Sequence, residues 1–291
     1  MDRARETLDE VRALSPTASA VLALAAAAVA AVAVSITQQR RRSVDEERGA
    51  EAARLSKTIL RLLSDEEPDD SAGAYAYAFH QLDDNLPSLV EGVGRLKSSH
   101  RAVNVLITNV SNSDLSSPIE GWSGAAKLAP LLEGRLDEDE DSVALVPFPF
   151  TDMVHTLNEA KAVVSYCEAR GIRDLVVVAP PFHLPRAAMT IISVAIREVP
   201  HLRIWAQPGP AQPWGEAAQH SQGTSFASRS HFIDSEMGRI AKYSAVGDIA
   251  STEQILAYLD ARDTVGQLAP VATDEVDRRA SIAGVPVLST P

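Results

Sequence analysis

The chain has little cysteine, few aromatic residues, and fewer basic than acidic side chains. Its single cysteine, Cys167, excludes an internal disulfide and any zinc site built on several cysteines. Lysine and arginine total 27 against 39 acidic residues, a formal charge of -12, and residues 1–50 contribute nothing to this deficit. Because a nucleic-acid-binding surface needs a basic face for the phosphates, this acidic body argues against a nucleic-acid partner.

Several catalytic motifs are also absent from the sequence. It has no G-x-x-x-x-G-K-[ST] loop, no G-x-G-x-x-G after a predicted strand, no G-x-S-x-G elbow and no H-E-x-x-H pair. These absences argue against a P-loop ATPase, a standard dinucleotide-binding enzyme and a serine hydrolase with a G-x-S-x-G elbow. We also expect no protein-bound metal.

One long uncharged run stands near the N-terminus. Residues 17–37 contain no charged side chain, and 10 of these 21 residues are alanine. At about 1.5 Å per residue, such a helix spans about 30 Å, the thickness of a bilayer core. The run predicts a single-pass membrane anchor. The alternatives are an alanine-rich soluble helix and a cleaved signal peptide, although acids before the run and arginines after it fit a signal peptide poorly. Arginines flank both ends almost equally, so the charge pattern does not assign the side of the membrane.

The rest of the chain divides by composition. We expect an N-terminal tail (1–16), the anchor (17–37), a charged juxtamembrane helix and linker (38–71), an α/β domain (72–262) and a C-terminal tail (263–291). Within the linker, the acidic, proline-broken segment 64–71 is typical of a solvated hinge.

From residue 72 onward, short apolar runs alternate with helical stretches. Strands are predicted at 74–79, 103–108, 143–146, 175–179 and 203–206, and helices at 86–96, 125–136, 157–170, 185–199, 234–243 and 252–262. This order predicts a Rossmann-like, doubly wound α/β fold with a mostly parallel five-stranded sheet. Ligands of such sheets bind beyond the carboxyl ends of the strands, so the loops there are the candidate site.

The strongest local signal follows the clearest strand. The segment 179–186 reads APPFHLPR, and its proline at 185 suits the start of a helix. His183 then lies just before a helix N-terminus and Arg186 in the first turn. A cation in the first helical turn is unfavourable for the helix alone, so an anion is expected beside it. That anion could be a ligand, or a protein carboxylate such as Glu159 or Glu236.

A second signal starts the helix at 157–170. Thr156 as N-cap and Glu159 three residues later fit a capping box, whereas Asn158 is unexplained by capping and could bind a ligand. The loop after the second strand adds two further polar candidates, Asn109 and Ser111.

As a set, these elements resemble the YdcF/SanA/ElyC-like family of bacterial envelope-associated proteins. The resemblance covers roughly residues 72–215 and depends on Thr-x-Asn-Glu-Ala at 156–160 and Phe-His-Leu-Pro-Arg-Ala at 182–187. It implies a Rossmann-like domain behind an N-terminal anchor, a role in envelope processes, and in one branch S-adenosylmethionine binding. It also implies that Thr156, Asn158, Glu159, His183 and Arg186 line one site. The chain departs from the family at 79–83 and 108–111, where glycine-rich loops are usual.

Three functions are consistent with this pattern. The first is a membrane-anchored domain that binds a small anionic or nucleotide-like ligand, with Arg186 holding the anion, His183 as general acid or base, and Glu159 orienting one of them. The second is a non-catalytic interaction module with a degenerate site. The third is an S-adenosylmethionine-binding protein or methyltransferase. Whether the protein is an enzyme stays open at this point.

Overall fold

The fold is built on a parallel β-sheet, which a computed structural model describes together with its flanking helices. The described residues are 45–65, 74–99, 104–116, 119–122, 124–136, 143–149, 154–220 and 225–265. The chain divides into two units, Met1–Leu55 and Ser56–Pro291, and the sheet belongs to the second. The expected anchor at 17–37, most of the linker and most of the C-terminal tail lie outside the described residues. Among the helices that are described, none is long and apolar enough to cross a membrane.

The sheet has five strands, all parallel, in the order β3-β2-β1-β4-β5. The strands are β1 (Tyr75–Ala78), β2 (Asn104–Asn109), β3 (Val143–Pro147), β4 (Asp174–Ala179) and β5 (Arg203–Pro208). The predicted α/β class, the five-stranded sheet and the chain positions of all five strands are thus confirmed. The strands are nearly continuous apolar runs because helices cover both faces of the sheet.

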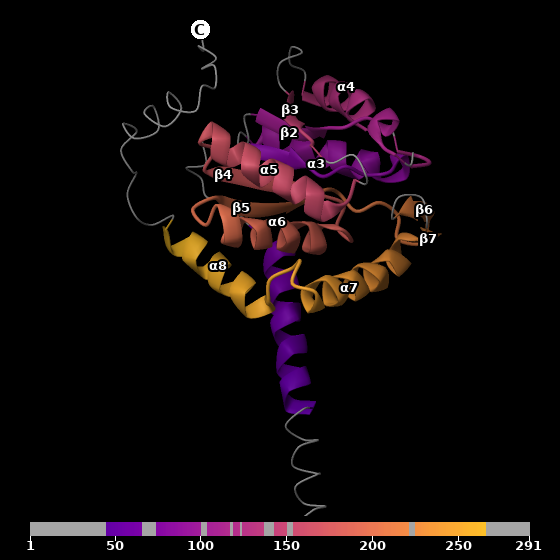
Figure 1. The fold of residues 1–291 in the computed structure, drawn as a ribbon. Helices are drawn as coiled ribbons and strands as arrows, with labels where there is room; N and C mark the ends of the chain where they lie inside the picture. The colour runs from indigo at the N-terminus through magenta and orange to yellow at the C-terminus, as the bar shows by residue number, and fades with distance from the viewer. Residues whose placement is uncertain are drawn as a thin grey trace, which may run out of the picture. The chain divides into compact units, whose positions relative to one another are not determined.

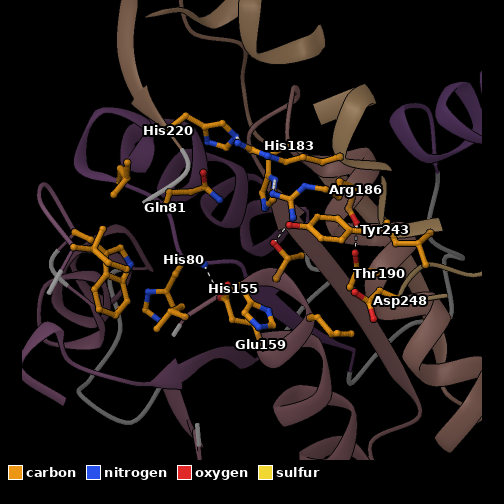
Figure 2. Close-up of a pocket in the computed structure, with 18 residues that line it drawn as sticks. His80, Gln81, His155, Glu159, His183, Arg186, Thr190, His220, Tyr243 and Asp248 are labelled. Carbon is orange, nitrogen blue, oxygen red and sulfur yellow. Dashed lines mark hydrogen bonds between the residues drawn. The ribbon is translucent and has the colours of Figure 1, made fainter. Parts of the chain in front are cut away.

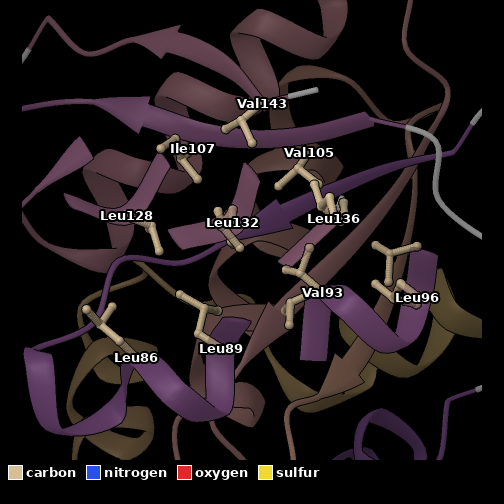
Figure 3. Packing of buried hydrophobic residues seen from close by; sticks show 14 of the residues in the cluster. Leu86, Leu89, Val93, Leu96, Val105, Ile107, Leu128, Leu132, Leu136 and Val143 are labelled. Atoms are coloured by element: carbon tan, nitrogen blue, oxygen red, sulfur yellow. The ribbon is translucent and has the colours of Figure 1, made fainter. Parts of the chain in front are cut away.

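Two helices cover each face of the sheet (Figure 1). The helices α3 (Leu86–Ser98) and α4 (Ala125–Leu136) pack on one face, and α5 (Thr156–Arg170) and α6 (Leu184–Glu198) pack on the other. Figure 3 shows the first interface, where leucines and valines of α3 and α4 meet the strand side chains Val105, Ile107 and Val143. Gly171 ends α5 in the left-handed conformation that glycine favours at a helix C-terminus.

The order of the strands reverses direction at β1. The chain runs outward from β1 through β2 to β3, and α5 then returns it to β4 on the other side of β1. Ala78 is in register with Val178, so the loops that begin at Phe79 and Pro180 leave the sheet at the same level. A crevice therefore opens beyond the carboxyl ends of β1 and β4, the usual ligand position in such sheets.

A short hairpin was not predicted. Strands β6 (Ala217–His220) and β7 (Ser225–Ser228) pair antiparallel after β5, and α7 (Arg229–Ala245) and α8 (Thr252–Val265) follow. Helix α7 begins five residues earlier than predicted. The hairpin sequences AAQH and SFAS are short and only weakly apolar, so they carry no strand pattern.

The expected solvated linker is instead anchored at its start. Residues 45–63 are helical, and Asp65, just beyond, pairs with Arg262 of α8 through two contacts of 2.7 Å. Its Oδ2 also accepts the backbone N–H of Ala206 in β5 at 3.0 Å. Only 8% of the Asp65 side chain is exposed. The prediction of a freely solvated segment is wrong at this residue, because Asp65 compensates a buried arginine and an edge-strand amide.

Two helical glycines provide a test of this packing. A Cβ at Gly92 of α3 would lie 2.9 Å from both Gly209 Cα and Val178 Cγ1, whereas a Cβ at Gly134 of α4 would meet nothing within 4 Å. We expect Gly92→Ala to lower the free energy of unfolding by about 1–3 kcal/mol through overpacking. The matched Gly134→Ala should raise it by about 0.5–1 kcal/mol through helix propensity. Urea unfolding of both variants checks this, and equal effects would contradict the close helix–sheet contact.

Candidate functional site

A cavity of about 460 Å³ lies at the point where the strand order reverses. In Figure 2, His80 and Gln81, which follow β1, lie on one side of it, and Tyr243 and Asp248 lie on the opposite side. Helices α5 and α6 contribute the residues between them, including Glu159, His183 and Arg186. The loops after β1 and β4, singled out from the sequence, therefore do border one cavity.

The carboxylate of Glu236 on α7 holds one wall of this cavity together. It is fully buried and lies within hydrogen-bond distance of two arginines and two histidines. Arg186 donates from Nε to Oε2 and Arg239 from Nη1 to Oε1, the latter at 2.6 Å. His183 Nδ1 lies 3.1 Å from Oε2, and His220 Nε2 lies 2.7 Å from Oε1. The protein carboxylate expected as one alternative beside Arg186 is therefore Glu236, and not Glu159.

Glu236 is ionised in spite of its burial. Burial alone would raise the pKa of this carboxyl, but the charge of Arg186 and the hydrogen bonds from both histidines hold it well below its usual range. Two guanidinium groups therefore share one buried carboxylate. The single negative charge of Glu236 balances only one of the two positive charges on this wall.

The same network fixes the tautomers of two histidines. Burial, with a contribution from Arg186, lowers the pKa of His183 to about 4, and burial also lowers the pKa of His220. Both imidazoles are therefore neutral near pH 7, and each has one N–H. Each donates this N–H to the ionised carboxylate of Glu236. His183 consequently donates from Nδ1, and its Nε2 carries a lone pair. Since His183 lines the cavity, Nε2 is the nitrogen left for an occupant.

Two further cavity histidines are also held in one tautomer. His80 Nε2 lies 3.0 Å from the carbonyl oxygen of Thr108, so it carries the N–H, and burial lowers the pKa of His80 to about 4. His155 is the N-cap of α5, and its Nδ1 accepts the backbone N–H of Asn158 at 3.3 Å. Burial lowers the pKa of His155 as well, which leaves Nε2–H as its free donor. All four imidazoles of the cavity wall are therefore neutral hydrogen-bonding groups.

Glu159 is the second buried carboxyl of the site, and its environment is the opposite of that of Glu236. Its Oε1 accepts the hydroxyl of Tyr77 at 2.9 Å and the backbone N–H of His80 at 3.1 Å. Among the described residues no guanidinium hydrogen-bonds to it, and burial outweighs these two hydrogen bonds and the more distant charge of Arg186, so the pKa of Glu159 is raised to about 7.

The predicted capping box at the start of α5 is wrong. His155 rather than Thr156 is the N-cap, and Glu159 turns inward to Tyr77 and His80 instead of reaching back to the helix start. Thr156 Oγ1 accepts from Arg186 Nη1 at 2.7 Å. The guanidinium of Arg186 therefore lies directly beside the N-terminus of α5, whose first residues Thr156 and Leu157 line the cavity.

Four of the predicted site residues come together, and three do not join them. Thr156, Glu159, His183 and Arg186 line the cavity, whereas Asn109, Asn158 and Ser111 are not among its lining residues. Asn109 is exposed at the end of β2. Ser111 caps a short 3₁₀ turn, η2 (Asn112–Asp114), where its side chain accepts the backbone N–H of Ser113. Its polarity is explained by that turn.

Sequence reasoning named Glu236 only as one alternative partner of Arg186, and it missed the rest of the contribution that α7 and the segments beside it make to the site. One signal was present: Phe232, Glu236 and Ile240 recur every four residues, and all three are buried. A glutamate inside an apolar helical stripe indicates a buried carboxylate that needs a cationic partner. His220 and Asp248 had no comparable signal, since they lie on a short hairpin and in a loop.

Metal binding finds no support in the described part of the chain, where no group of three or more His, Cys, Asp or Glu side chains is placed to hold an ion. Comparison with known proteins adds no assignment. No model of a known protein family matches the chain, and no curated protein matches its sequence.

The Glu236 network makes a prediction about stability. Glu236→Gln leaves Arg186 and Arg239 buried beside a neutral amide, and we expect the free energy of unfolding to fall by about 3–5 kcal/mol. Asp234→Asn, an exposed acid two residues earlier on α7, is the matched control and should change it by less than about 0.5 kcal/mol. Denaturant unfolding at pH 7 measures both variants. Equal stabilities would show that Glu236 does not hold the wall together.

Proposed function

We propose that the domain binds a small anionic ligand in this cavity, with the acid group of the ligand beside Arg186 and the N-terminus of α5. The supporting observation is the convergence of Arg186, Thr156 and the first turn of α5 on one part of the cavity wall. A guanidinium has five N–H donors, and the described contacts of Arg186 with acceptors use three: those from Nε and Nη2 to Glu236 and that from Nη1 to Thr156. The second N–H on Nη1 and the backbone amides of Thr156 and Leu157, for which the described part of the chain offers no acceptor, are the groups that would donate to an oxyanion.

The positive charge in the cavity is confined to one part of its wall. Arg186 and Arg239 carry two positive charges, and Glu236 and Asp248 carry two negative charges. Glu236 lies behind the arginines, whereas Asp248 lies on the cavity wall and would repel an anion. We infer that the positive potential is confined to the surroundings of Arg186, which favours a ligand with one compact acid group.

His183 gives this site a chemical capability. With Nδ1 donating to Glu236, its Nε2 lone pair can accept a hydrogen bond or a proton from a hydroxyl or a water beside the bound acid group. The role expected for Glu159, orienting His183 or Arg186, is not supported, since its hydrogen bonds go to Tyr77 and His80. An enzyme that uses His183 as general base is consistent with this geometry, and we propose no specific reaction.

S-adenosylmethionine, which the family resemblance implies for one branch, fits these residues less well. Its sulfonium is positively charged, and the exposed cationic part of the wall is formed by Arg186 and Arg239. Among the described residues that line the cavity, Asp248 and Glu159 are the carboxyl groups that could face such a charge. The donor set therefore favours an anion, and we derive no methyl-transfer step.

Calorimetry with inorganic sulfate and with phosphorylated metabolites tests the proposal. Arg186→Lys keeps the charge but loses the fork that reaches Thr156, and we expect affinity to fall at least about tenfold. Asp248→Asn removes a repelling charge, and affinity should rise about threefold to tenfold. Arg95→Lys, on the exposed face of α3 and away from the cavity lining, is the control and should bind like the wild type. If no probe binds to the wild type, the interaction-module alternative replaces this function.

We also propose that residues 17–37 hold the protein at a membrane. The support is the length of the uncharged run and the arginines at 40–42 that follow it. On fractionation of cells, the full chain should sediment with membranes and resist alkaline carbonate, whereas a chain without 17–37 should stay in the supernatant. Deletion of the charged tail 2–14 is the control and should leave sedimentation unchanged. A full chain found in the supernatant would contradict the anchor.

A further inference from the structure

Glu159 has one carboxylate oxygen that the protein leaves available. Oε1 is held by the Tyr77 hydroxyl and the His80 amide, which fix the carboxyl group in place. Oε2 makes no hydrogen bond with any of the described residues, although Glu159 is only 4% exposed and lines the cavity. A buried carboxyl oriented in this way presents its second oxygen to whatever occupies the cavity.

The titratable groups around Glu159, unlike Glu159 itself, do not change protonation state near neutral pH. Tyr77 contacts Glu159 directly. The other titratable or charged groups line the cavity with it: His80 after β1, His155 at the start of α5, His183 and Arg186 at the start of α6, Arg239 and Tyr243 on α7, and His220 and Asp248 on the segments on either side of α7. Burial raises the pKa of Tyr77 and lowers the pKa of each histidine, so these groups stay neutral. Both arginines stay charged. Burial moves the pKa of Glu159, in contrast, to about 7.

We propose that protonated Glu159 donates a hydrogen bond from Oε2 to the acid group of the ligand, so that the cavity takes up its anion together with one proton. This inference rests on the proposed function and names how the same site recognises its ligand. Arg186 and the start of α5 approach the anion with charge and N–H groups, and Glu159 adds an O–H donor from the neighbouring wall.

Repulsion gives the physical reason for this coupling. An ionised Glu159 would place a second negative charge against the anion in a water-poor cavity, where charges interact strongly. A protonated Glu159 removes that repulsion and adds a short O–H···O⁻ hydrogen bond. The bound anion therefore favours the protonated form, and by linkage protonation favours the bound anion. A cationic ligand would have the opposite sign and would bind better as the pH rises.

The inference defines a class of ligand. The ligand presents an oxyanion, such as a phosphate, sulfate or carboxylate group, with at least one oxygen left over to accept from Glu159 after Arg186 is satisfied. His183 Nε2, a pure acceptor, takes a hydroxyl or water hydrogen on the same ligand. This combination of two donors and one acceptor excludes a simple ammonium or sulfonium group as the part bound there.

Calorimetry with inorganic sulfate, which does not titrate between pH 6 and 8, tests the coupling on the full chain. The protonated fraction of a carboxyl with a pKa of about 7 falls about tenfold from pH 6 to pH 8, and we expect the affinity for sulfate to fall equally. Parallel titrations in two buffers of different ionisation enthalpy should show uptake of roughly half a proton at pH 7.

Glu159→Gln mimics the protonated form, because its amide oxygen still accepts from Tyr77 and His80 while its NH₂ still donates. We expect this variant to bind sulfate at pH 8 as tightly as at pH 6, without proton uptake. Glu168→Gln, an exposed acid on the same helix, is the control and should retain the wild-type pH dependence. Carbon-13 NMR of the Glu159 carboxyl gives a second readout, since saturating sulfate should raise its titration midpoint.

The outcomes separate the two proposals. If sulfate binds to the wild type with no dependence on pH, or if Glu159 is ionised in the saturated complex at pH 6, the inference is overturned and the anion site stands. If sulfate binds at neither pH to the wild type or to Glu159→Gln, the anion site itself is overturned and the inference with it. Tight binding lost only from Glu159→Gln would also overturn it, since the amide should replace the protonated acid.

Discussion

Burial of the Glu236 carboxylate is the interaction on which the cavity depends. A carboxylate without access to water is costly unless charged and hydrogen-bonding partners surround it, and here two arginines and two histidines do so. Arg239 belongs to α7 itself and His220 to the nearby β6, whereas His183 and Arg186 belong to the start of α6, 50 or more residues away along the chain. One side chain of α7 therefore joins the β6–β7 hairpin and α7 to the parallel sheet, and the cavity exists because this joint holds them.

The two buried carboxyls, those of Glu236 and Glu159, have different roles because their surroundings differ. Glu236 is ionised because cations meet both of its oxygens, and it orients the histidines beside it. Glu159 meets only a hydroxyl and an amide at one oxygen, so burial dominates and its pKa lies near neutrality. Pairs of acids whose pKa values are pushed apart in this way are typical of sites that bind or move protons.

Much of the fold could be predicted from the sequence, and less of the site. The run LVVVA at 175–179 and the helical apolar spacing around it are strong local patterns, and the parallel order follows from alternation of strands and helices. His183 and Arg186 were found because a helix start has known requirements. Glu236 and His220 were not assigned to the site, since their meaning depends on contacts across 50 or more residues with α6 or on a hairpin without a strand pattern. Thr156 and Glu159 were placed in the site only through the family resemblance. From local chemistry their spacing of three residues looked like a capping box, whereas their actual partners are long-range.

The pairing of Asp65 with Arg262 and with the amide of Ala206 has a consequence for where the folded domain begins. Ala206 lies on β5, an edge strand, and open edge amides are templates for pairing with other chains. Arg262 is itself buried and also stacks near Trp205. A chain shortened to begin after residue 65 would leave the guanidinium with Asp263 as its carboxylate partner and the strand amide without its acceptor, so the exposed edge would favour self-association. The composition boundary near residue 72 is therefore not the physical boundary of the unit that holds the sheet, since that unit begins at Ser56 and includes Asp65.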